Sequence, residues 1–479
     1  MMNVERQALV ALKWSAIAKV LGQLISWAVT LFVLRILAPT DYGLYAIVSM
    51  VISTVAGLAE FGLGASLIQA PTLDRRELSR IAGALCLLNI VCGLLVAASA
   101  PWLSEIFRDP RLSLLIGVSS LQFAIFAIEV LPQAMVHRGM DFARVARNEV
   151  ASTAVATLST LLLAATGGGV WALVVGGLIG ATVRAALFVS AVPVVWPSFH
   201  LRGIGRHVKF GGIVSVTRLL WQLTYQMDTL IAARFLSREA LGLYSVAMHL
   251  ATMPMDKAMG IVNQVALPAV ARLQKELPRV RTRLLESLRL LAFMAVPSLW
   301  GIAAVAPEFV YIVLGAKWEP AITVLQIVSL AAPARMLAAV LATALLAIGA
   351  AEVELRNTVV GALVLPASLA VGVHWHLDGL AAAWGFGVLI TGALNFPRTS
   401  AALGLTIAQV GTATRAPLLA GCLMHLAVWA VRLLLQDSGE ILRLSVLILA
   451  GGATYVTGAL ALDRAIWTDL RRIASALRS

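Results

Sequence analysis

Apolar stretches of 18 or more residues recur along almost the whole chain of 479 residues. A bilayer core is about 30 Å thick, so a helix needs about 20 apolar residues to cross it, because unpaired backbone groups are costly in lipid. Hydrophobic residues make up 60% of the chain and charged residues 13%, whereas soluble chains carry roughly 45–50% and about 25%. The sequence therefore predicts an all-α polytopic membrane protein with no sizeable soluble domain.

About fourteen of these stretches are long enough to be transmembrane helices. Most lysines and arginines fall in the short loops on the side of the N-terminus, and such loops stay in the cytoplasm. We therefore expect both termini to be cytoplasmic. The net charge of +13 then reflects topology and nearby anionic headgroups, not a nucleic-acid partner. The expected helices are 13–37, 42–69, 80–101, 112–134, 147–167, 169–193, 211–236, 241–271, 286–307, 320–349, 357–375, 378–397, 416–434 and 441–462.

One short sequence occurs twice, 199 residues apart: "RILAPTDYGLYAIV" begins at residue 35 and "RFLSREALGLYSVA" at residue 234. Six predicted helices separate the copies, so both halves enter the membrane in the same direction. This predicts two tandem six-helix bundles, related by a pseudo-two-fold axis along the membrane normal, and a C-terminal helix pair. The expected parts are an N-terminal lobe (1–195), a cytoplasmic linker (196–210), a C-terminal lobe (211–398), and a linker, helix pair and basic cytoplasmic tail (399–479).

Each copy contains the tripeptide Gly-Leu-Tyr, at residues 43–45 and 242–244, shortly after an apolar run. We expect a tight helical hairpin in which the glycine adopts a backbone conformation closed to other residues. The tyrosine is expected at the outer interface. We interpret the motif as part of the scaffold, without a direct role in chemistry.

Four segments resemble a known family: the first hairpin, "AEFGLGASLIQ", "WQLTYQMDTLIAARFLSREALGLYSVA" and "VLGAKWEPAITVLQIVSLA". They look like the Wzx-type flippases of the multidrug/oligosaccharidyl-lipid/polysaccharide exporter superfamily, and are most similar to colanic-acid and exopolysaccharide exporters. The resemblance covers nearly all of the first twelve predicted helices. The last two predicted helices, 416–434 and 441–462, go beyond a twelve-helix plan, as in the related lipid II flippases.

The resemblance implies a V-shaped pair of lobes around a central cavity in a bacterial inner membrane. Its members move undecaprenyl-diphosphate-linked oligosaccharide to the outer leaflet by alternating access, for exopolysaccharide or lipopolysaccharide biosynthesis. Membrane lipids are implied as partners, and polysaccharide polymerase and export machinery are further candidates.

Such a substrate needs a polar cavity for its glycan and cations for its diphosphate. Lys19 lies four residues before a glutamine on its predicted helix, and Arg218 has the same spacing, so each cation shares a helix face with an amide. We expect these two cations to bind diphosphate, although snorkelling to the headgroups would also explain them. Further candidate cations are Arg335 and Lys257, whereas Arg184 is explained as well by helix packing or snorkelling. The expected polar residues of the cavity are Gln23, Gln222, Gln226 and Tyr225.

Other titratable residues in the predicted helices are candidates for proton or ion coupling, or for pairing with the cations. Burial raises the pKa of a carboxylate and lowers that of a histidine, so either type can change protonation during transport. Glu60 lies at a depth similar to that of Lys19, which makes this pair geometrically feasible. The full set is Glu60, Asp228, His249 and Glu129, the last together with Gln122.

No pattern in the chain indicates catalysis. The three cysteines lack metal-binding spacing and no phosphate-binding glycine loop occurs, so we expect no catalytic residue, metal or cofactor. A multispan glycosyltransferase would need an acidic pair on a large extramembrane loop. Two further functions within the same superfamily are a lipid II flippase and a drug or cation antiporter, and the antiporter would be expected to have a more acidic and aromatic cavity.

Overall fold

The computed structural model describes residues 26–59, 67, 74–193, 195–200, 205, 215, 219, 222–254 and 276–463. Every regular element within these residues is a helix. Ten continuous helical stretches within the described residues are long and apolar enough to cross a membrane, and one of them, Ala351–Leu403, contains two of the predicted spans. The helices predicted at 13–37, 211–236 and 241–271 are described only in part, so the number of fourteen stays a prediction.

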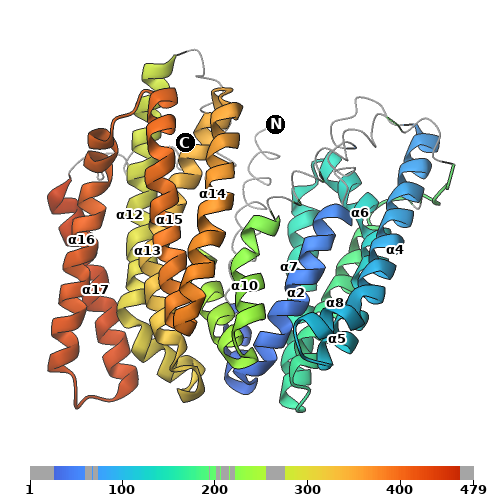
Figure 1. Ribbon diagram of the computed structural model, residues 1–479, viewed down its shortest axis with the longest axis horizontal. Helices are drawn as coiled ribbons and strands as arrows, with labels where there is room; N and C mark the ends of the chain where they lie inside the picture. Colours follow the sequence, from blue (N-terminus) through green and yellow to red (C-terminus); the bar gives the residue numbers. More distant parts are fainter. Residues whose placement is uncertain are drawn as a thin grey trace, which may run out of the picture. The chain divides into compact units, whose positions relative to one another are not determined.

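The chain divides into two compact units, residues 1–242 and 243–479. In the first unit, α7 packs against α8, and α6 packs against both α4 and α8. Figure 1 shows these helices as blue and green ribbons. The helices of the first unit are Ser26–Ile36, α2 (Pro39–Ala59), α4 (Arg75–Ile106), α5 (Arg111–Ser119), α6 (Leu121–Arg138), α7 (Phe142–Ala165), α8 (Val170–Val189) and α10 (Met227–Phe235).

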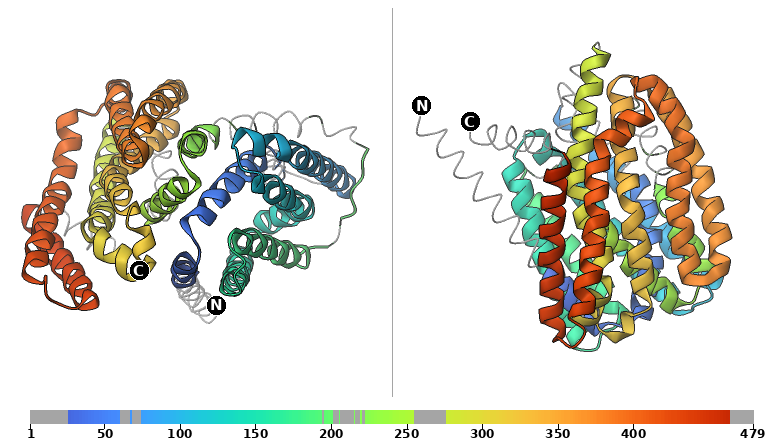
Figure 2. Two further views of the ribbon diagram at one scale, coloured as in Figure 1. Left: turned by 60° about the horizontal axis from the view of Figure 1, so that its bottom comes forward. Right: turned by 90° about the vertical axis from the view of Figure 1, so that its left-hand side faces the viewer.

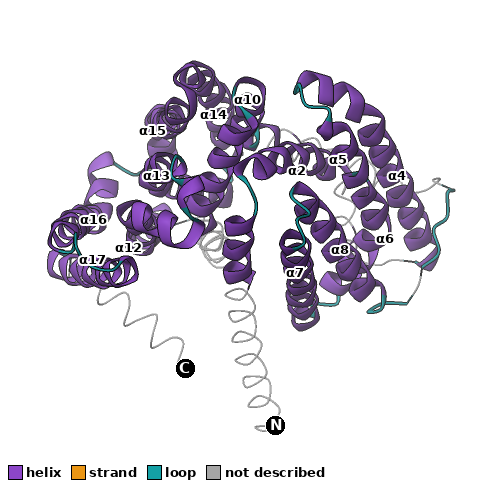
Figure 3. Cartoon of the chain, turned by 90° about the horizontal axis from the view of Figure 1, so that it is seen from below, coloured by secondary structure: helices purple, strands orange, loops and turns teal. Residues whose placement is uncertain are grey.

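The second unit is organised around its longest helix, α12, which packs against α13, α16 and α17. The two last helices form an antiparallel pair, drawn in red in Figure 2, and Figure 3 shows the same helices end-on. A further helix, 238–254, crosses the boundary between the units. The elements of the second unit are α12 (Leu277–Phe309), η1 (Val310–Leu314), η2 (Ala316–Trp318), α13 (Ala321–Ala347), α14 (Ala351–Gly372), η3 (Val373–Trp375), α15 (His376–Leu403), α16 (Ile407–Leu434) and α17 (Glu440–Leu462).

The start of α12 differs from the prediction by nine residues, because the predicted helix began at 286 and the observed one begins at Leu277. The added turns come from a basic segment that looked like a loop. They are nevertheless amphipathic, since Val280, Leu284 and Leu288 are buried at helical spacing while arginines occupy the other face. Pro278 lies in the first turn, where its missing N–H costs nothing.

The repeated Gly-Leu-Tyr tripeptides lie inside helices, which corrects the prediction of a strained turn. Neither Gly43 nor Gly242 has a positive φ. Both are instead sites of close backbone approach: a Cβ on Gly43 would collide with the carbonyl oxygen of Arg238, and one on Gly242 with that of Pro39. Because Arg238 is the repeat equivalent of Pro39, 199 residues later, this contact within the first unit is reciprocal. The second tyrosine, Tyr244, is buried within the protein, and its expected place at the outer interface stays a prediction.

The C-terminal helix pair is fixed to α12 by a buried charge. Glu308 of α12 is 3% exposed and receives two hydrogen bonds from Arg432 of α16, at 2.7 Å from Nε and 2.8 Å from Nη2. Arg443 of α17 adds a third nitrogen 3.7 Å away. Deeper in the unit, the Tyr455 hydroxyl donates to the carbonyl oxygen of Phe293 at 3.0 Å. These contacts make the pair an integral part of the second unit.

A second charged cluster joins the turn between α4 and α5 to the start of helix 238–254. Asp109 in this turn accepts hydrogen bonds from Nε and Nη2 of Arg111, at 3.1 and 2.9 Å. The Nε of Arg238 lies 3.9 Å from the same carboxylate, and its Nη atoms donate to the carbonyl oxygens of Ala233 and Phe107. The hydrogen bonds from Arg111 hold the pKa of Asp109 below its usual value.

This shift predicts a pH-dependent contribution to stability. A carboxylate with a depressed pKa stabilises the fold above its unfolded pKa of about 3.9, and that contribution is lost as the pH falls through the folded value. Asp109→Asn should therefore lower the unfolding temperature in detergent at pH 7, and the difference from wild type should shrink as the pH falls below about 4. A difference that stays constant down to pH 3 would show that the carboxylate charge contributes nothing.

Candidate functional site

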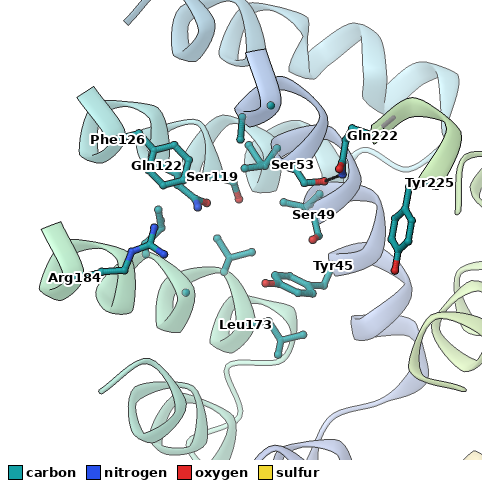
Figure 4. Close-up of a pocket in the computed structure, with 17 residues that line it drawn as sticks. Tyr45, Ser49, Ser53, Ser119, Gln122, Phe126, Leu173, Arg184, Gln222 and Tyr225 are labelled. Carbon is teal, nitrogen blue, oxygen red and sulfur yellow. Dashed lines mark hydrogen bonds between the residues drawn. The ribbon is translucent and has the colours of Figure 1, made fainter. Parts of the chain in front are cut away.

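The first unit contains a polar cavity of about 830 Å³ between apolar helices. Its walls come from α2, α5, α6 and α8, with one side formed by residues 222–225. Figure 4 shows the side chains that line it. Its polar lining consists of Tyr45, Ser49, Ser53, Ser119, Gln122, Arg184, Gln222 and Tyr225.

The wall formed by α2 follows from a regular spacing in the sequence. Tyr45, Ser49, Ser53 and Gly57 recur every four residues and therefore lie on one helix face. A Cβ on Gly57 would meet no atom within 4 Å, so this glycine leaves the cavity wide at that level. The serines were not among the predicted site residues, and their four-residue spacing is the signal that could have found them.

The charged group of the cavity is Arg184 of α8, which pairs with Glu129 of α6. Their Nε and Oε1 atoms are 2.7 Å apart, and Nη2 donates to Oε2 at 3.3 Å. Glu129 is 1% exposed, whereas the Arg184 side chain is 30% exposed and lines the cavity. Glu129 thus lies behind the arginine and holds its guanidinium at the wall. Glu129 therefore forms an ion pair with Arg184, and its predicted role in coupling stays a prediction.

The two described glutamines among the expected cavity residues donate to the same hydroxyl. Gln222 and Gln226 donate from Nε2 to the Oγ of Ser53 at 3.1 and 3.0 Å. The Ser53 hydroxyl in turn donates to the Met50 carbonyl oxygen at 3.2 Å. The helix is interrupted at Gln226, immediately before α10 begins at Met227. Gln222 lines the cavity together with Tyr225, whereas Gln226 supports it from outside.

None of the other described candidates is among the residues that line this cavity. Asp228 is buried in the first turn of α10, where its Oδ1 accepts a hydrogen bond from the backbone N–H of Thr229 at 2.7 Å. His249, on helix 238–254, is exposed. Arg335 of α13 lies over the ring of Trp384 in the second unit, 5.6 Å from its centroid. The predicted residues Lys19, Gln23, Glu60, Arg218 and Lys257 lie outside the described residues.

The cavity is equipped to bind, since its polar groups are hydroxyls, amides and one guanidinium. Hydroxyls and amides both donate and accept hydrogen bonds, which suits a sugar, while a guanidinium suits a phosphate. In the described part of the chain, no three His, Cys, Asp or Glu side chains are grouped in a way that could hold a metal ion.

Comparisons with known proteins agree with this picture. A sequence profile described as polysaccharide biosynthesis protein matches residues 32–323. An "uncharacterized membrane protein in cps region" of Klebsiella pneumoniae is 25% identical over 398 residues, which cover 82% of this chain and 81% of that protein. The lipopolysaccharide biosynthesis protein WzxC of Escherichia coli (strain K12) is 26% identical over 333 residues, covering 68% of this chain and 67% of that protein.

Among solved structures, the lipid II flippase MurJ in an inward closed conformation has a TM-score of 0.74. The match covers 94% of this chain and 99% of that chain at 13% identity, so it shows a shared fold. The family profile matches more than half of the chain, and the predicted resemblance is confirmed. The chain therefore belongs to the Wzx-type family of polysaccharide biosynthesis membrane proteins.

Proposed function

We propose that the chain is a flippase that moves undecaprenyl-diphosphate-linked oligosaccharide across a bacterial inner membrane by alternating access. The observation that carries the proposal is the cavity of the first unit, which combines neutral polar side chains with one guanidinium. A lipid-linked sugar makes the same combination of demands. Its glycan needs hydrogen bonds, its diphosphate needs a cation, and its tail can stay in lipid.

The proposed roles follow from position. Ser49, Ser53 and Gln122 contact the glycan, and Arg184 contacts the diphosphate together with the sequence candidates Lys19 and Arg218. Arg335 and Lys257 are proposed as further cations on the pathway. For coupling, Asp228, Glu60 and His249 are the proposed residues, and Glu129 is proposed as the charge partner of Arg184. Polymerase and export machinery are proposed partners.

The test is the sidedness of the lipid-linked oligosaccharide in cells depleted of this protein. If the chain is the flippase, the completed lipid-linked repeat accumulates on the cytoplasmic face, where an added membrane-impermeant glycosidase or lectin does not reach it in intact spheroplasts. Restoring the wild-type chain should return it to the outer face, while an unrelated membrane protein expressed at the same level should not. Unchanged sidedness with normal polysaccharide export would contradict the proposal and favour drug or cation export.

A further inference from the structure

A second pocket lies in the first unit, at the end of α4 where that helix enters the membrane. It measures about 700 Å³ and shares no residue with the polar cavity described above. We propose that it binds the phosphate group of an anionic lipid headgroup. The proposal does not depend on what the chain transports. The pocket is lined by Asp74, Arg75, Arg76, Ser79, Arg80, Val195, Trp196, Ser198 and His200.

The wall opposite α4 is a short extended segment, 195–200, which Figure 1 shows running beside the start of that helix. Two hydrogen bonds to one residue fix it there. The backbone N–H of Ser198 donates to the carbonyl oxygen of Ser79 at 2.8 Å, and the Ser79 hydroxyl donates to that of Trp196 at 2.6 Å. Gly83, one turn further along α4, allows this approach, because a Cβ there would collide with the backbone of Ser198.

The arginines that line the pocket favour an anionic ligand. Arg75, Arg76 and Arg80 all come from the first two turns of α4 and line the pocket, and the acid among the lining residues is Asp74. Guanidinium groups match the oxygens of a phosphate in geometry as well as charge.

The depth of the pocket identifies the phosphate as that of a lipid. The arginines occupy the first turns of a helix that continues through an apolar span, which puts them at the level of the headgroups. Trp196, on the opposite wall, is 80% exposed, and Phe199 beside it is also exposed. Exposed aromatic residues of this kind favour the membrane interface. The pocket thus opens where phospholipid phosphates lie.

The experiment measures lipid binding to the purified full-length protein in detergent, by the rise in unfolding temperature on titration with phosphatidylglycerol. Arg75→Gln/Arg76→Gln/Arg80→Gln should weaken binding roughly tenfold or more, because three charge-assisted contacts are lost. The matched control is Arg279→Gln/Arg281→Gln/Arg283→Gln, which removes the same charge from the first turns of α12, where none of the three residues lines the pocket, and should bind like wild type. Equal binding by both triple variants and wild type would overturn the proposal.

Further ligands distinguish the source of the phosphate. Undecaprenyl diphosphate that binds more tightly than phosphatidylglycerol, in the same arginine-dependent way, would identify the transported class of lipid as the occupant. Equal binding of phosphatidylcholine, or of inorganic pyrophosphate alone, would contradict an anionic-lipid site. If the glutamine triple variant fails to insert, the single variant Arg76→Gln and the charge-preserving Arg75→Lys/Arg76→Lys/Arg80→Lys repeat the comparison. If the site depends on positive charge, Arg76→Gln should lose phosphatidylglycerol binding and the triple lysine variant should keep it.

Discussion

Replacing Glu129 by glutamine is expected to abolish transport and to lower the free energy of unfolding by about 3–5 kcal/mol. The reason is that Glu129 is almost completely buried and holds Arg184 through two contacts, so its loss leaves a guanidinium without its carboxylate among apolar helices. The measurements are export of the lipid-linked oligosaccharide per inserted molecule and thermal unfolding in detergent. Normal export by this variant would show that the pair does not position Arg184.

The double variant Glu129→Gln/Arg184→Gln separates stability from binding. Removing both charges eliminates the unpaired guanidinium, so most of the lost stability should return. Export should remain impaired, because the cation proposed to bind the diphosphate is also missing. A double variant that is stable and exports normally would contradict the binding role of Arg184 and leave only a packing role for the pair.

A matched control is available in the second unit. Glu308 is as buried as Glu129 and pairs with Arg432 at the same Nε–Oε1 distance of 2.7 Å. Glu308→Gln should therefore cost a similar free energy of unfolding. Because neither Glu308 nor Arg432 lines the polar cavity, export per folded molecule should stay near that of wild type. Equal loss of export in both variants would mean that instability alone explains the effect.

The helices could be predicted from the sequence because lipid imposes a minimum apolar length. The predicted span 320–349 corresponds to α13, Ala321–Ala347, and the span 441–462 to α17, Glu440–Leu462. The start of α12 was missed because its first turns carry many arginines, and only the burial of one face, by residues four apart, reveals them as helical. Hydropathy measures average polarity, whereas an amphipathic segment depends on which residues face the protein.

The candidate site could be predicted only where its residues lie on one helix. The spacing of Gln222 and Gln226 placed them on a common face, and the structure has both of them donating to Ser53. The importance of Arg184 was not apparent, because a single arginine near the end of a span is also what snorkelling would produce. Its partner Glu129 lies 55 residues away in the chain. That distance is bridged by the packing of α6 against α8, which no local pattern encodes.

The glycines of the repeat also depend on contacts that the sequence does not reveal. The sequence reveals that Gly43 and Gly242 are equivalent, but the reason for glycine depends on what lies opposite. In the structure each faces a backbone carbonyl oxygen at the start of the other copy's helix, Arg238 for Gly43 and Pro39 for Gly242. In the sequence, a glycine that is needed because two backbones approach closely looks the same as a glycine that is needed for a turn. The two explanations differ in the effect expected of alanine.

Gly43→Ala and Gly242→Ala are each expected to lower the free energy of unfolding by about 3 kcal/mol, because the added methyl group has only backbone to displace. Both methyl groups would separate the same pair of helix starts, so the double variant should cost clearly less than the sum of the single variants. Thermal or denaturant unfolding in detergent measures the stability of all three variants.

Gly117→Ala on α5 is the matched control. A Cβ there meets nothing within 4 Å, so alanine should be neutral or should stabilise by up to about 1 kcal/mol. Full additivity of the two repeat variants would contradict a single reciprocal contact, and the neutrality of both would return these glycines to the role of ordinary helix residues.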